Sequence, residues 1–218
     1  MRRLLTVSFC LVMLFHLAKS QQLSAEEILN NSIAFHDPKG EWPSLKTELT
    51  FKETRPNGPD RKTIAMIDNS KSFFKLNRND EEVYKVEVED CVVEKGEGTS
   101  ERGLMLRNYY TYLWGLPMKL KDPGTNLDET YTEEEVDGVA CYVLRVPYEK
   151  DIWYFYMRKD NFAMIAYKFY KDEAAGKGEY IPTEGLFTVG SMKIPNNRTW
   201  YELPGNRVLG TDILTVAQ

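Results

Sequence analysis

The chain has 218 residues, of which 42% are hydrophobic and 28% charged, and its formal net charge is −5 at pH 7. This length and apolar content suit one domain with a sizeable core. The acidic balance argues against a nucleic-acid partner, which would require a basic face.

Residues 1–20 have the layout of a secretory signal peptide. Arg2 and Arg3 precede an apolar run over 4–17, and Ala18 and Ser20 supply the small residues expected before a cleavage site. The run is short for a transmembrane helix, so an uncleaved anchor is the weaker alternative. We therefore predict an exported protein with a single domain over 21–218.

The segment after this leader is predicted to form a helix. Ser24 followed by Glu27 matches a capping box, and apolar residues then recur at helical spacing. Pro38 disfavours helical geometry in the residue before it, so the helix is expected to end near His36.

From Leu45 the hydrophobic period changes to two. Alternating segments separated by turn-forming residues predict an antiparallel meander with one buried face. The predicted strands in this block cover residues 45–53, 61–68, 72–78 and 82–90.

Helical spacing returns over 106–114 and leads into "YLWGLPMKLKDPGTNL", residues 112–127. This segment is apolar, yet its glycines and prolines exclude a long helix or a central strand. A second block of predicted strands follows over 129–136, 139–146, 151–157, 162–171, 178–190 and 208–216. Within it, 152–157 and 162–170 are apolar on both alternate faces and are expected to be covered on both sides.

These elements predict a mainly β (α+β) fold. Its expected form is a curved antiparallel sheet, or incomplete β-barrel, with the helices and the irregular apolar segment on the concave side.

Cys91 and Cys141 lie in strand-like runs. They form either a disulfide or two separate buried thiols, and no neighbouring histidine completes a metal site with them.

The sequence offers little for catalysis. His36 stands beside Asp37, but the chain has no nucleophile elbow, zinc-binding helix motif or phosphate loop. We interpret His36 as a packing residue at the helix end, where the helix dipole favours its protonated form. A hydrolase that uses His36 is the less favoured alternative, and no enzyme activity, cofactor or metal is expected.

The apolar surplus points instead to binding. A curved sheet leaves a concave volume, and 112–127 is predicted to be a lid over it or, alternatively, a plug with no ligand beneath. Lys119 and Lys121 would suit contact with an anionic headgroup at a membrane periphery. The predicted ligand-binding residues are Trp114, Leu116, Met118, Leu120, Trp153, Phe155 and Tyr167.

Several motifs also carry a family resemblance. "GLPMKLKDPGT", "DGVACYVLRVPYEKDIWYFYM", "GEYIPTEG" and "IPNNRTWYEL" resemble a secreted family of unknown function typical of Bacteroidota. Its sequence plan is similar to that of the periplasmic outer-membrane lipoprotein-carrier superfamily. That resemblance implies an incomplete barrel with helices over an apolar cavity that holds acyl chains.

The resemblance implies a protein of the periplasm or the outer-membrane periphery. It also implies that the protein binds a lipid-like small molecule or a lipoprotein acyl chain without catalysis. The alternative is an envelope protein-interaction or sensor module that uses the same cleft for a protein partner.

Overall fold

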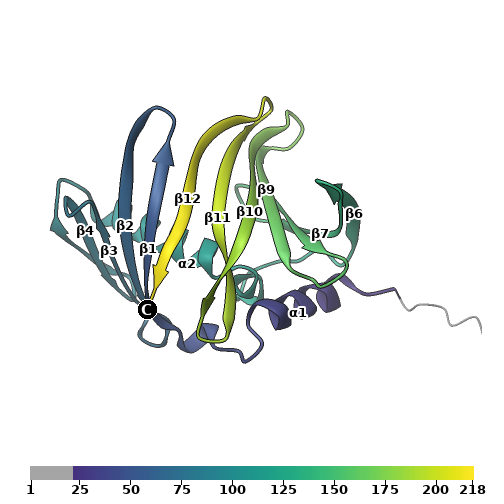
Figure 1. Ribbon diagram of the computed structural model, residues 1–218, viewed down its shortest axis with the longest axis horizontal. Helices are drawn as coiled ribbons and strands as arrows, with labels where there is room; N and C mark the ends of the chain where they lie inside the picture. The colour runs from purple at the N-terminus through teal and green to yellow at the C-terminus, as the bar shows by residue number, and fades with distance from the viewer. Residues whose placement is uncertain (1–21) are drawn as a thin grey trace, which may run out of the picture.

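The computed structural model describes residues 22–218, so the predicted signal segment lies outside the described residues. One antiparallel sheet curves around two α-helices, as Figure 1 shows. The helices are α1 (Ala25–His36), α2 (Ser100–Trp114) and the short 3-10 helices η1 (Trp42–Ser44), η2 (Asn69–Lys71) and η3 (Met118–Lys121). The strands are β1 (Lys46–Arg55), β2 (Gly58–Asp68), β3 (Phe73–Arg78), β4 (Glu82–Glu87), β5 (Asp90–Lys95), β6 (Tyr131–Val136), β7 (Val139–Pro147), β8 (Ile152–Arg158), β9 (Met164–Asp172), β10 (Lys177–Val189), β11 (Met192–Leu203) and β12 (Arg207–Ala217).

The sheet consists of two meanders, which are joined where the first strand of the domain pairs with the last. Its order is β5-β4-β3-β2-β1-β12-β11-β10-β9-β8-β7-β6. The first strand pairs with the last, with Phe51 opposite Leu214. Strands β5 and β6 are left as the two edges, so the sheet curves without closing. The predicted incomplete barrel is confirmed.

Two predictions about the strands were wrong. The segment predicted as one strand over 82–90 is divided between β4 and β5, because the chain turns at Val88, whose φ is +57°. Strand β11 was missed. It contains Pro195 and two asparagines, which are poor strand formers, but pairing with β10 and β12 on either side overrides that local preference.

Helix α1 forms where the sequence predicts it, whereas α2 contains the predicted 106–114 but begins six residues earlier, at Ser100. The capping box of Ser24 and Glu27 is present at the start of α1, and the helix ends at His36. Thr99 is the N-cap of α2, and its side chain accepts a hydrogen bond from the Arg102 amide. No helix among residues 22–218 is long and apolar enough to cross a membrane.

The main core lies between the two helices and the concave face of the sheet. A smaller cluster on the opposite face of β7–β9 contains Cys141, Val143, Tyr156 and Ala166. The prediction that the central strands are covered on both sides holds only in part, because Tyr156 and Ala166 are buried on this face whereas Tyr154 and Tyr170 stay partly exposed. Cys91 packs against the main core, whereas Cys141 belongs to the second cluster, and both are free thiols.

Gly103 allows α2 to approach the sheet closely. A Cβ at this position would collide with the Cys91 Sγ and lie 2.8 Å from Cδ1 of the Tyr84 ring. Alanine normally stabilises a helix interior by about 1 kcal/mol relative to glycine. We predict the opposite here, with Gly103→Ala lowering the free energy of unfolding by about 2 kcal/mol through overpacking.

Urea unfolding checks this prediction. Asn108→Ala, at an exposed position of the same helix, serves as the control and should change stability by less than about 0.5 kcal/mol. A Gly103→Ala protein more stable than the parent would show that the close approach is not limiting.

Candidate functional site

The structure brings all seven predicted ligand-binding residues into one apolar interior on the concave side. Six of them are buried, and Trp153 is partly exposed and packs against the same core. The buried residues are Trp114, Leu116, Met118, Leu120, Phe155 and Tyr167.

Aromatic rings line this interior in two groups. Trp114 packs on Phe51, with ring centroids 4.4 Å apart. On the other side, Trp153 stacks on Phe169 at 4.7 Å and on Tyr167 at 5.9 Å. Further aromatic contacts connect neighbouring rings in both groups, so the lining extends from β1 to β8.

The irregular segment fills this interior. We call residues 115–121 the plug. Leu116 is 0% exposed, Met118 7% and Leu120 3%, so the space that was predicted to hold a ligand is occupied by side chains of the protein itself. In this conformation the segment is a plug, as the alternative interpretation of the sequence held.

The plug is attached to the sheet by its side chains rather than its backbone. Lys119 N donates to Gly115 O at 2.9 Å and Leu120 N donates to Pro117 O at 3.0 Å, both within the plug. After the plug, the chain first bonds a strand where Asp128 N donates to Arg145 O. Among the described residues, no backbone–backbone hydrogen bond joins 115–127 to the sheet.

A charged network lies beside the aromatic lining. Glu53 and Asp212 are each 1% exposed. Glu53 accepts a hydrogen bond from the Tyr110 hydroxyl and lies 3.3 Å from Arg61 Nε. Burial raises the pKa of Tyr110, and the Glu53 carboxylate raises it further, so the phenol stays protonated and donates.

Asp212 is also fully engaged. It accepts from Arg55 Nη1 at 3.1 Å, from the Tyr109 hydroxyl at 3.0 Å and from Trp200 Nε1 at 3.1 Å. The sequence analysis did not predict this network, although the alternation of β1 contained one indication of it. Glu53 occupies the next core-facing position after Leu49 and Phe51 on the same alternating strand.

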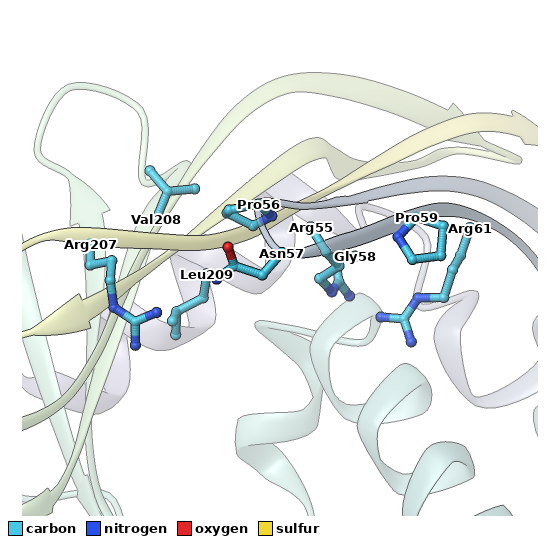
Figure 2. A pocket seen from close by; sticks show the side chains of 9 residues that line it. All are labelled: Arg55, Pro56, Asn57, Gly58, Pro59, Arg61, Arg207, Val208 and Leu209. Carbon is cyan, nitrogen blue, oxygen red and sulfur yellow. The ribbon is translucent and has the colours of Figure 1, made fainter.

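A pocket of about 470 Å³ lies at the rim of the half-barrel, between the β1–β2 and β11–β12 hairpins (Figure 2). Arg55, Arg61 and Arg207 point to the side of the sheet on which α2 lies, whereas Val208 points away. The lining residues are Arg55, Pro56, Asn57, Gly58, Pro59, Arg61, Arg207, Val208 and Leu209.

Each arginine of the rim pocket already has a carboxylate partner. Arg207 Nε donates to Glu202 at 2.9 Å, and the buried network pairs the other two. The pocket is therefore a charge-balanced surface pocket rather than an unpaired anion site.

His36 is held by two backbone groups. Its Nδ1 lies 2.5 Å from Lys193 O and donates to it, while Met164 N donates to its Nε2 at 2.9 Å. Burial lowers its pKa from 6.5 to about 4, so the ring is neutral. The expectation of a protonated imidazole was wrong, because loss of solvation outweighs the helix dipole.

Asp37 is engaged in the same way, accepting hydrogen bonds from the amides of Glu41 and Trp42. With both ring nitrogens of His36 and both oxygens of Asp37 committed to backbone, this pair has no free group for the base of a hydrolase. Among residues 22–218, no cluster of three His, Cys, Asp or Glu side chains could hold a metal ion.

A protein-family model matches residues 3–215 of this chain. The chain belongs to the family of unknown function DUF6503. No curated protein matches the chain. The motifs that indicated a family of unknown function are thus confirmed.

Solved structures show the fold relationship. A LolA superfamily protein from Nitrosomonas europaea is 10% identical, with a TM-score of 0.58 over 90% of this chain and 94% of that one. A putative outer membrane lipoprotein-sorting protein domain from Vibrio parahaemolyticus is 8% identical, with a TM-score of 0.53 over 89% and 91%. A DUF1329 family protein from Desulfovibrio piger is 9% identical, with a TM-score of 0.50 over 89% and 92%. The DUF6503 chain therefore has a LolA-like fold.

The buried network predicts a large effect of removing one charge. Glu53→Gln should lower the free energy of unfolding by about 3–5 kcal/mol, because it leaves the buried Arg78 guanidinium, 3.8 Å away, short of its counter-charge. Glu48→Gln, on the same strand at a half-exposed position, is the control and should be nearly neutral. Equal denaturation midpoints for the two variants would contradict this role of Glu53.

The neutral His36 predicts a specific loss of stability in acid. Its pKa is lower in the folded state than the ordinary value of 6.5, so the unfolded state binds the proton more tightly. Its contribution is complete above about pH 6.5 and is lost as pH falls toward 4, by up to about 3 kcal/mol. Urea titrations at pH 7 and pH 5 should show a smaller acid-induced loss for His36→Gln than for the parent. The same loss in both proteins would contradict the assignment.

Proposed function

We propose that this protein is a non-enzymatic binding protein that holds a hydrophobic, lipid-like ligand on the concave side of its half-barrel. The observation that carries the proposal is an aromatic interior covered by a plug that is attached through side chains alone. The seven residues predicted from the sequence are the proposed ligand contacts, from Trp114 to Tyr167.

The energetics favour an exchange between plug and ligand. Exposing Leu116, Met118 and Leu120 to water would cost about 2 kcal/mol each, so spontaneous opening would be rare. An acyl chain that enters the same space replaces those apolar contacts and offsets the cost. No sheet hydrogen bond of the plug backbone needs to break.

Partly exposed aromatic side chains also offer a ligand its first contact at the surface. Trp153 is partly exposed, and Tyr112 contacts its edge with ring centroids 5.5 Å apart. Tyr112 in turn shares a hydrogen bond of 2.9 Å with the Tyr148 hydroxyl. Aromatic rings with polar ends suit the entrance of a lipid site, where one end is apolar and the other wet.

The fold relationship and the sequence support the setting of this function. One protein of similar fold is a putative outer membrane lipoprotein-sorting protein domain, which makes lipoprotein acyl chains one candidate ligand. The signal-like segment 1–20 supports export, and we propose action in the periplasm or at the outer-membrane periphery, with peripheral membrane contact.

A protein-interaction module is the second candidate. Strand β5 is an edge of the sheet, and Val88 and Val92 beside it are 61% and 57% exposed. A sheet edge flanked by exposed apolar side chains can pair with a strand of another protein. An envelope protein bound there would support a sensor or adaptor role.

Truncation of the plug tests the ligand proposal. Met118→Ala weakens the packing that competes with the ligand, so the neutral probe N-phenyl-1-naphthylamine should bind more tightly, by up to about tenfold. Met105→Ala is the matched control, since Met105 is 52% exposed on α2, outside the plug. Fluorescence titration of the three proteins gives the dissociation constants.

The proposal fails if the parent binds no probe and yields no lipid on solvent extraction. Weaker or unchanged binding by Met118→Ala would contradict the competition between plug and ligand.

A further inference from the structure

Arg198 is a fully buried positive charge in the middle of the apolar interior. It is 0% exposed, and its guanidinium lies 4.0 Å from the centroid of the Trp114 ring. Its Nη groups donate to two backbone carbonyls, Leu113 O at 3.0 Å and Pro195 O at 3.1 Å. Neutral carbonyls and an aromatic face thus surround a full charge.

Among the described residues, no carboxylate oxygen lies within 4.0 Å of this guanidinium. Asp212 is the strand partner of Arg198 across β11 and β12, but it already accepts bonds from Arg55, Tyr109 and Trp200. Every arginine of the rim pocket, by contrast, has a carboxylate within reach. Buried charges in proteins are normally paired directly, and this guanidinium has no carboxylate of its own.

Three polar atoms of this region also lack hydrogen-bond partners. They are Arg198 Nε, the Tyr167 hydroxyl and Trp114 Nε1, all buried. Burial raises the pKa of the Tyr167 phenol and the neighbouring Arg198 opposes that rise, so the phenol remains a donor next to the guanidinium. Unpaired buried donors are rare in native proteins and call for an acceptor.

The position of Arg198 connects it to the plug. It bonds the carbonyl of Leu113, two residues before the plug begins. Movement of the plug would therefore open a path to the guanidinium.

We propose that Arg198, together with Tyr167 and Trp114, binds the carboxylate of a long-chain fatty acid whose hydrocarbon chain replaces the plug. This inference rests on the proposed function and narrows its ligand class. A carboxylate carries one charge, which balances one unpaired guanidinium, whereas a phosphate monoester carries more. Its two oxygens also accept the bonds that the three unpartnered groups can donate.

An uncharged acyl chain would leave Arg198 unpaired. The site therefore favours a free fatty acid over the acyl chains of a lipoprotein, which carry no carboxylate at their ends. Charge-assisted hydrogen bonds account for this preference, which should amount to about 10- to 100-fold in the dissociation constant.

The test compares oleate, oleyl alcohol and acetate by calorimetric titration of the 22–218 chain. We expect oleate to bind about 10- to 100-fold more tightly than oleyl alcohol, and acetate to bind far more weakly than either. Arg198→Met should bind the two long-chain ligands equally, because it removes the group that distinguishes a carboxylate from an alcohol. Arg158→Met, at a surface arginine paired with Asp160, is the control and should keep the preference for oleate.

Each other outcome has a distinct meaning. Equal binding of oleate and oleyl alcohol by the parent overturns this inference and leaves the proposed function standing. No binding of either ligand overturns both. Acetate that binds as tightly as oleate identifies a site for small anions and also overturns the inference. If Arg198→Met does not fold, the comparison of ligands in the parent still decides.

Discussion

The whole structure depends on covering the concave face of a sheet that curves without closing. Closed barrels bury their interior by closing the sheet on itself, but here β5 and β6 remain unpaired edges. The apolar face between them would be exposed unless other parts of the chain filled it. Helices α1 and α2 and the plug supply that cover, and they account for the position of almost every buried side chain in the main core.

The three parts of the cover are held in different ways. Helix α1 is tied to β9 and β11 through the two ring nitrogens of His36. Helix α2 is anchored by the hydrogen bond from Tyr110 to Glu53 and by the close approach at Gly103. The plug has its apolar side chains and one surface ion pair, between Lys121 and Glu26 of α1, and no backbone hydrogen bond to the sheet among the described residues. The least restrained part of the cover thus lies over the aromatic lining, which is the arrangement that a reversible binding site requires.

The charges inside this interior fall into two groups. Glu53 and Asp212 satisfy arginines and phenols around them, so their network holds the strands and α2 together. Arg198 has no such partner and lies beneath the end of α2. A buried charge needs a counter-charge, and Glu53 and Asp212 have theirs in direct ion pairs whereas Arg198 does not.

Local sequence patterns determined much of this protein. The capping box at Ser24, the alternation over 45–53 and the helical spacing over 106–114 predicted their elements, because each depends on neighbours a few residues apart. The mixture of apolar residues with glycine and proline also marked 112–127 as an irregular segment of the concave side, without deciding between a lid and a plug.

Only the tertiary structure decided how distant residues interact. Strand β11 forms because two neighbours pair with it, and the ring of His36 is neutral because β9 and β11 bury it. The network around Glu53 and the missing partner of Arg198 depend in the same way on segments far apart in the chain. Burial and pairing are properties of the folded arrangement, and no local period in the sequence encodes them.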